Sequence, residues 1–235
     1  MSPNKMKISE RNETVLLFRG IENLCMMHIS DIHLWYSTHV LEELTDLIVK
    51  NQPKLLVLTG DYFDIPAGAQ NFKQFLLHVS RISTVLFVFG NHDRIYGRKV
   101  LNMFYGIPNC TCVDNSVFSY RSEVGNVFNF TSWKNRNNLP ENSNQVNIIL
   151  IHNPERIREK ELSNVNLVFA GHLHGGQFRI FTTRSGTHFP GNLFYRYGID
   201  RKQIDATTLI VSRGLGDTFP FRWNCPKEVV NVFIR

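Results

Sequence analysis

The chain lacks a long apolar run. None of its apolar stretches approaches the ~20 residues that a helix needs to cross a bilayer, and the longest, such as residues 147–151, have the length of a strand. The first residues, 1–7, also lack the apolar segment of a signal peptide. We therefore expect a cytoplasmic protein without a transmembrane segment.

Cysteine is scarce and is not arranged for a structural metal site. The four cysteines show no CxxC spacing. Two of them, Cys110 and Cys112, would face the same side of a strand. Free thiols in a reducing compartment are the expected state of Cys25, Cys110, Cys112 and Cys225.

The sequence has no Lys/Arg run of the kind that forms a nucleic-acid-binding arm, so no nucleic acid partner is expected. The formal net charge is nevertheless +6, from 26 Lys and Arg against 20 Asp and Glu. This balance suits an anionic substrate or an anionic membrane surface. With 43% hydrophobic residues, the composition is that of an ordinary globular protein.

Strand and helix patterns alternate in the first half of the chain. Apolar residues follow helical spacing over 37–51 and 71–81, and each of these segments leads to an apolar strand, at 54–59 and 84–89. Such alternation predicts βαβ units with a parallel core, whose functional groups gather at the carboxyl ends of the strands.

Other segments predict additional strands. Residues 110–133 contain short alternating runs typical of an antiparallel second sheet, and a hairpin of 14–18 and 24–29 is expected to open the fold. Pro154 is expected to begin a short helix that ends at Leu162. The whole chain, 1–235, is predicted to form a single domain. Closing strands are expected at 207–212 and 229–234.

Polar residues typical of metal sites follow five of the apolar runs. The run 166–170 leads into Gly171-His172-Leu173-His174, and four other runs end in comparable residues. Five rigid strand tips with the same kind of side chain are hard to explain by chance. The residues at the tips, in chain order, are Asp31 and His33, Asp61, Asn91 and His92, His152, and His172 and His174.

The chemistry of this set predicts a pair of metal ions. Asp, His and Asn donors without thiolate suit divalent Mn, Fe, Zn or Co, and the set is too large for one ion. Two ions ~3.5–4 Å apart can lower the pKa of a bridging water and hold a phosphoryl group for in-line displacement. The sequence therefore predicts phosphate ester hydrolysis.

The same motifs resemble those of the calcineurin-like metallophosphoesterases. They read Asp31-Ile-His33, Gly60-Asp61, Gly90-Asn-His-Asp93, His152 and Gly171-His-Leu-His174, in the family's order. The resemblance implies an α+β fold of αββα type, a two-sheet β-sandwich flanked by helices. It also implies a bridging hydroxide between two metals that attacks a phosphodiester or pyrophosphate bond.

The resemblance further assigns roles to residues. One metal would be held by Asp31, His33 and His174, and the other by Asn91, His152 and His172, with Asp61 between them. His92 would protonate or stabilise the leaving oxygen, and Asp93 would fix the orientation of His92.

Longer strings, such as His152-Asn-Pro154 and Ser212-Arg-Gly-Leu-Gly216, resemble a small bacterial branch of the family that is often membrane-associated. This branch implies two alternatives for the substrate, a soluble phosphodiester or a lipid-linked nucleotide such as UDP-2,3-diacylglucosamine of lipid A synthesis. Peripheral contact with the inner membrane face would accompany the second. A non-catalytic scaffold with the same fold is a further alternative, but the intact Asn91-His92-Asp93 favours an enzyme.

Several other residues are candidates for supporting roles. Asp64 is interpreted as the cap of the following helix rather than as a partner of a metal ligand. Arg94, Arg213 and Arg222 are candidate contacts for a substrate phosphate, and Arg213 is favoured because it follows an apolar strand within a Gly-rich loop. The aromatic and basic segment 178–197 forms either a lip beside the site or a hairpin with aromatics in the core.

Overall fold

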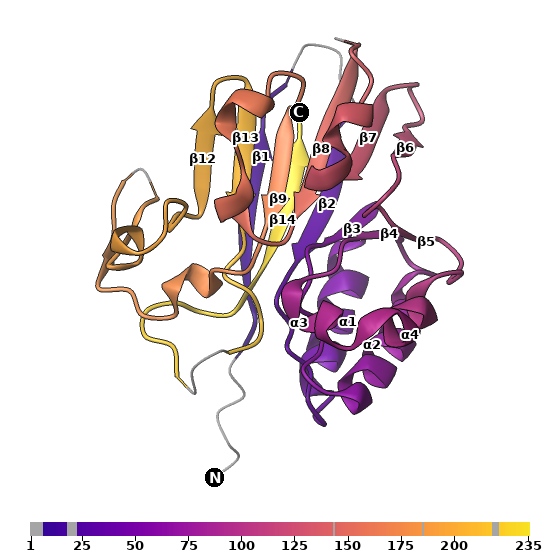
Figure 1. The fold of residues 1–235 in the computed structure, drawn as a ribbon, viewed down its shortest axis with the longest axis vertical. Coiled ribbons are helices and arrows are strands. Elements are labelled where there is room, and N and C mark those ends of the chain that lie inside the picture. The colour runs from indigo at the N-terminus through magenta and orange to yellow at the C-terminus, as the bar shows by residue number, and fades with distance from the viewer. Residues whose placement is uncertain (1–6, 18–22, 143, 185, 218–220) are drawn as a thin grey trace.

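The computed structural model describes residues 7–17, 23–142, 144–184, 186–217 and 221–235. Two six-stranded mixed sheets pack face to face, as the resemblance implied (Figure 1). The first sheet has the order β1 (Ser9–Val15), β14 (Glu228–Ile234), β2 (Leu24–Ile29), β3 (Leu55–Leu58), β4 (Thr84–Phe87) and β5 (Cys110–Cys112). The second has the order β12 (Arg201–Ile204), β13 (Thr207–Val211), β9 (Leu167–Ala170), β8 (Gln145–Ile151), β7 (Val127–Ser132) and β6 (Phe118–Arg121).

The central strands are apolar on both faces because both faces are covered. All four residues of β3 are buried, and so are all four of β9. Between the sheets, Val57 and Leu86 of the first pack in one cluster with Phe130 and Ile148 of the second. This continuous burial explains why the strands read as apolar runs without alternation.

Helices cover the outer face of the first sheet. α1 (His39–Asn51) and α2 (Pro66–Val79) connect β2, β3 and β4, which run parallel, so the predicted βαβ units are confirmed. Leu44 and Leu76 from these helices pack against the sheet in one buried cluster. The short elements α3 (Asn91–Ile95), α4 (Gly97–Leu101) and η1 (Asn102–Phe104) follow β4.

The outer face of the second sheet is covered by turns rather than by long helices. The helix expected from Pro154 to Leu162 consists of two separate 3₁₀ turns, η3 (Pro154–Arg156) and η4 (Glu159–Glu161). A third turn, η2 (Trp133–Asn138), follows β7. Ile157, Leu162 and Tyr197 are buried against this face.

The expected hairpin at the start of the chain is wrong. β14, from the far end of the sequence, lies between β1 and β2, parallel to β1 and antiparallel to β2. Part of the expected turn, residues 18–22, lies outside the described residues. β5 also differs from expectation, because it joins the first sheet, parallel to β4.

Within the described ranges, no helix has the length and apolar character needed to cross a membrane. All four cysteines are free thiols.

Candidate metal centre

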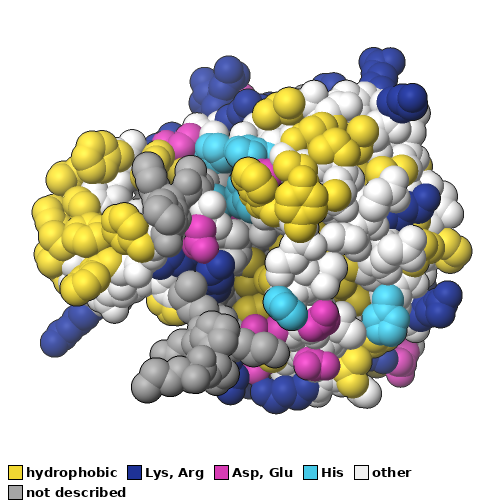
Figure 2. Space-filling model, turned by 90° about the horizontal axis from the view of Figure 1, so that it is seen from below, with side chains coloured by type: hydrophobic (Ala, Val, Ile, Leu, Met, Phe, Trp, Pro, Cys, Tyr) yellow, Lys and Arg dark blue, Asp and Glu magenta, His cyan; other side chains and the backbone are white. Residues whose placement is uncertain are grey.

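The strand ends bring the predicted residues together at one edge of the sandwich. β2, β3 and β4 of the first sheet and β8 and β9 of the second each end next to one or two of them. Contacts between the two sheets join them, since His33 lies against His174 and Asp61 against His152. Figure 2 shows histidine side chains at the surface between two groups of hydrophobic side chains.

One group of potential ligands consists of Asp31, His33 and His174, whose ligand atoms lie within 4.8 Å of one another. The Nε2 atoms of the two histidines face each other at 3.2 Å. His174 Nε2 lies 3.7 Å from Asp31 Oδ1. All three side chains are buried.

A second group consists of Asp61, His152 and His172, with ligand atoms inside the same limit, and a third combines His33 and Asp61 with His92. His152 Nε2 lies 2.9 Å from Asn91 Oδ1, 3.0 Å from His172 Nδ1 and 3.1 Å from Asp61 Oδ2. The same oxygen of Asp61 lies 3.9 Å from His33 Nε2. Asp61 is therefore placed between the two groups.

The hydrogen bonds of three imidazoles indicate which nitrogen faces the site. Nδ1 of His33 donates to Asp64 Oδ1 at 2.9 Å, Nδ1 of His152 to the Thr59 carbonyl at 2.8 Å, and Nδ1 of His174 to the Gly216 carbonyl at 3.2 Å. Because Nδ1 donates outward, Nε2 of each ring faces the other potential ligand atoms of its group. A divalent cation fits such a donor set, and the outer partners are those typical of metal-binding histidines.

The backbone at these tips is held in an unusual conformation. Asp31, His33, Asp61, His172 and His174 all have φ between 48° and 72°, the left-handed region that non-glycine residues seldom adopt. Such strain persists only where the surroundings fix it, and it gathers at functional sites.

Two glycines leave room for side chains that pack closely at the centre. A Cβ on Gly90 would lie 2.0 Å from Asp61 Oδ1, and one on Gly171 would lie 1.9 Å from Ser30 Oγ. Only glycine therefore fits at these two places.

Burial and neighbouring charges shift the pKa values within the centre. Burial alone would raise the pKa of Asp61, but the hydrogen bond and charge of His152 outweigh it and bring that pKa to about 2. Burial lowers the pKa of His174 to about 4, which leaves its ring neutral and able to act as a ligand.

His92 lies at the edge of the centre and is hydrogen-bonded to Asp64 rather than to Asp93. Its Nδ1 lies 2.7 Å from Asp64 Oδ1, and its side chain is 41% exposed. Asp64 also accepts from His33 Nδ1 and from Trp35 Nε1 at 3.0 Å. The helix cap is Ile65, so the interpretation of Asp64 as a cap is wrong.

Asp93 has a different task from the one expected. Its buried carboxylate accepts hydrogen bonds of 2.8 Å from the backbone N–H groups of Asp61, Tyr62 and Gly90. Asp93 thus fixes the backbone that carries Asp61, and the orientation of His92 depends on Asp64.

A buried chain of hydroxyl groups extends from the centre into the core. Ser30 Oγ donates to Asp31 Oδ2 at 2.5 Å and lies 2.7 Å from Thr59 Oγ1, which in turn lies 2.8 Å from His28 Nε2. All four side chains are fully buried. The periodicity of the strands gave no sign of this chain, because its members come from two strands.

The three candidate arginines have different environments. Arg94 is half exposed, pairs with Asp114 at 2.6 Å and lines a pocket beside His152 and His172. Arg213 instead binds Asp200 at 2.8 Å through Nε and Glu228 at 3.3 Å through Nη1, so its guanidinium is engaged inside the protein. Arg222 is also enclosed, with bonds to Asp217 and to backbone carbonyls.

The segment 178–197 contains a short hairpin of β10 (Phe181–Thr182) and β11 (His188–Phe189), followed by η6 (Gly191–Leu193). Tyr197 is buried, but most of the other aromatic side chains are not. Phe221 and Trp223 are exposed as well, and Trp223 lies against Phe178. The exposed apolar residues of these two segments, here called the aromatic surface, are Phe178, Ile180, Phe181, Leu193, Phe194, Tyr195, Phe221 and Trp223, each at least 40% exposed.

Comparison with known proteins shows relatives along most of the chain. An uncharacterised metallophosphoesterase of Bacillus subtilis, YkuE, is 24% identical over 97% of this chain and 85% of its own length. The phosphodiesterase YaeI of Escherichia coli is 26% identical over 87% of this chain and 79% of its own length. An uncharacterised metallophosphoesterase of Helicobacter pylori is 26% identical over 88% of this chain, which spans 59% of that relative.

Solved structures share the fold at low identity. The protein TT1561 of Thermus thermophilus superposes with a TM-score of 0.53 at 12% identity, over 83% of this chain and 91% of that one. The calcineurin-like phosphoesterase YfkN of Bacillus subtilis gives a TM-score of 0.50 at 12% identity, over 90% of each chain. The profile of the calcineurin-like phosphoesterases matches residues 26–176, and the chain belongs to that family as a hydrolase of phosphoric esters.

Proposed function

We propose that the protein hydrolyses a phosphodiester or pyrophosphate bond with two divalent metal ions, Mn, Fe or Zn, at the candidate centre. The arrangement of two ligand groups around one carboxylate, that of Asp61, carries this proposal. Asp31, His33 and His174 would hold one ion, and Asn91, His152 and His172 the other, with Asp61 shared. When bound, such ions activate water and neutralise phosphoryl oxygens.

The protein's own residues complete the reaction. Water attacks phosphorus and loses a proton to the solvent, the bond to the leaving oxygen breaks, and His92 gives that oxygen a proton. Asp64 holds Nδ1 of His92, so the opposite nitrogen, Nε2, is the one that donates. The phosphodiesterase name of the E. coli relative supports a diester substrate. We also propose that residues 1–235 act as one domain, because strands from both ends of the chain share one sheet.

The test combines metal analysis with one substitution. We expect the purified protein to bind close to two transition-metal ions and to hydrolyse bis(4-nitrophenyl) phosphate. His92→Asn should lower kcat by ~10²–10⁴ with metal content unchanged, because it removes only the proton donor. Absence of bound metal together with no activity after addition of Mn would overturn the proposal, and unchanged turnover would remove His92 from the reaction.

The aromatic surface favours a more specific candidate, a lipid-linked nucleotide pyrophosphatase that contacts a membrane peripherally. Phe178 and Trp223 lie side by side, with ring centroids 6.3 Å apart, and Phe194 is 77% exposed. Arg184 and Arg196 are exposed in the same segment, and Arg196 pairs with Glu159 at 2.9 Å. Exposed aromatics beside basic residues are typical of surfaces that enter an anionic lipid interface. Figure 2 shows hydrophobic side chains gathered on one lobe beside the histidines.

Vesicle flotation tests this candidate. We expect the protein to float with vesicles rich in phosphatidylglycerol and to release UMP from UDP-2,3-diacylglucosamine. Phe181→Ser with Phe194→Ser should lower vesicle affinity at least tenfold because two apolar anchors are lost. Val49→Ser, on an exposed position of α1, is the matched control and should float as the unmodified protein does. Equal flotation of both variants would contradict a role for the aromatic surface.

A further inference from the structure

A pocket of about 830 Å³ opens beside the second group of candidate ligands. Asn91, His152 and His172 form part of its wall. A cavity of this size accommodates a ligand much larger than one phosphoryl group. With the scissile phosphate at the candidate centre, the pocket is where a neighbouring part of the substrate would lie.

Four cationic side chains line this pocket, and each comes from a different element. They are Arg94 of α3, Arg98 of α4, Lys134 of η2 and Arg156 of η3. Among the described lining residues, Asp114 is the only carboxylate, and it pairs with Arg94 at 2.6 Å. Four cations against one carboxylate leave three formal positive charges in excess.

Three of these cations are available to a ligand. Arg98, Lys134 and Arg156 are exposed, and in the part of the chain that the structure describes none of them forms an ion pair. Their neighbour Arg136 differs, because it stacks on Trp133 at 4.5 Å and pairs with Glu161. Like charges that surround one concave surface attract anions and raise their local concentration.

We propose that this pocket binds a second phosphate of the substrate, one that is not cleaved. The substrate is then a phosphodiester or diphosphate that carries at least one additional phosphate. The inference rests on the proposed function, since it takes the scissile phosphate to lie at the candidate metal centre. Arg98, Lys134 and Arg156 are the specificity-determining residues, because Arg and Lys bind phosphate oxygens through charge-assisted hydrogen bonds.

A matched pair of substrates tests the proposal. Thymidine 5′-(4-nitrophenyl phosphate) and the same ester with a 3′-phosphate differ only in the additional phosphate and release the same chromophore. We expect kcat/KM for the second ester to be at least tenfold higher, with the difference in KM. Equal values for the two esters in the unmodified protein would overturn the inference.

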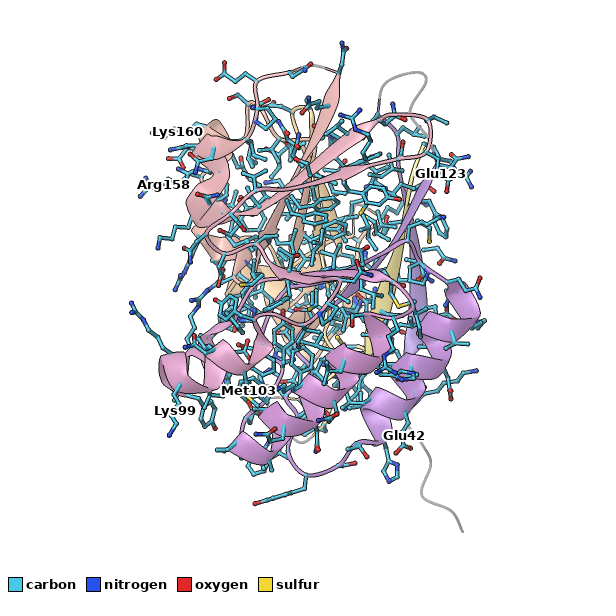
Figure 3. The ribbon with its side chains drawn as sticks, turned by 90° about the vertical axis from the view of Figure 1, so that its right-hand side faces the viewer. Glu42, Lys99, Met103, Glu123, Arg158 and Lys160 are labelled. Atoms are coloured by element: carbon cyan, nitrogen blue, oxygen red, sulfur yellow. The ribbon has the colours of Figure 1, made fainter. Side chains whose placement is uncertain are left out.

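Substitutions then assign the effect to the pocket. Each single substitution should reduce the preference for the 3′-phosphate ester by a factor of up to about ten. The substitutions are Arg98→Gln, Lys134→Gln and Arg156→Gln, and the triple variant should lose the preference. Lys99→Gln is the control for Arg98→Gln, because Lys99 is the next residue on α4 and does not line the pocket. Arg158→Gln is a second control, because Arg158 does not line the pocket either. Figure 3 shows that Lys99 and Arg158 project from the same side of the molecule. A preference that survives the triple substitution would contradict the assignment.

A binding measurement separates this inference from the proposed function. If neither ester is cleaved with added Mn, the proposed function fails, and calorimetry still decides about the pocket. Thymidine 3′,5′-bisphosphate should bind at least tenfold more tightly than thymidine 5′-monophosphate, and the triple variant should lose this difference. Equal affinities in the unmodified protein would overturn the inference.

Discussion

At the scale of single residues, Asp64 connects the two chemical tasks of the centre. One of its oxygens accepts from both His33, a candidate ligand, and His92, the candidate acid. Burial raises the pKa of Asp64, but the hydrogen bond and charge of His33 outweigh this and lower it. Asp64 therefore stays ionised and holds both rings with their Nδ1 protons toward it.

Asp64→Asn tests this double role. We expect ~10–100-fold weaker Mn binding or lower kcat, as is usual when a partner of a metal-binding histidine is changed. The kcat of the variant at saturating Mn should also fall, because His92 loses the partner that orients its ring. Asp46→Asn, an exposed acid of α1, is the control. Unchanged Mn affinity together with an unchanged kcat would show that Asp64 holds neither ring.

At the scale of elements, the sequence predicted the residues at the strand tips better than it predicted the long connections. Each tip turns directly after a buried strand, and Asp31, Asp61 and His172 adopt left-handed conformations there. The motif spacing predicted these positions because side chain and strand are adjacent in sequence. The partner of β1 could not be predicted in this way, because apolar alternation shows that a strand exists and not which strand lies beside it.

The connection 178–197 shows the same limit of prediction from the sequence pattern. Its aromatics fitted either a core hairpin or an exposed lip, since both require the same residue types. The structure has the hairpin and leaves Phe181 and Phe194 exposed, whereas Tyr197 is buried. Which rings are covered depends on Tyr197 packing against the second sheet and on the position of Trp223 beside Phe178.

At the scale of the whole molecule, buried ionisable groups make stability depend on pH. Burial lowers the pKa of His28 from 6.5 to about 3. Below pH 6.5 the unfolded chain therefore binds a proton that the folded protein does not, and stability falls as the pH decreases toward 3. Asp93 acts in the opposite direction, because burial and the charge of Asp61 raise its pKa from 3.8 to about 6, and its destabilising effect grows as the pH rises between those values.

Substitution of His28 isolates its contribution. Between pH 7 and pH 5, His28 should lower the free energy of unfolding by about 2 kcal/mol, and His28→Gln should lack this part of the pH dependence. Urea unfolding of both proteins at the two pH values, after chelation of metal, measures the difference, and Asp93 is common to both. His78→Gln, an exposed histidine of α2, should retain the dependence of the unmodified protein. Parallel pH curves for His28→Gln and the unmodified protein would contradict the expectation.

The sequence by itself determined the family, the two-layer fold and the positions of the candidate ligands. These depend on short-range patterns, a buried strand followed at once by Asp, Asn or His, and such patterns are visible along the chain. Only the tertiary structure decided that Asp64 bonds His92, that Asp200 and Glu228 engage Arg213, and that four cations share one pocket. These contacts join residues of different elements. Strand pairing within a sheet brings Asp64 to His92 and Asp200 to Arg213, whereas packing of the two sheets brings Glu228 to Arg213 and assembles the pocket.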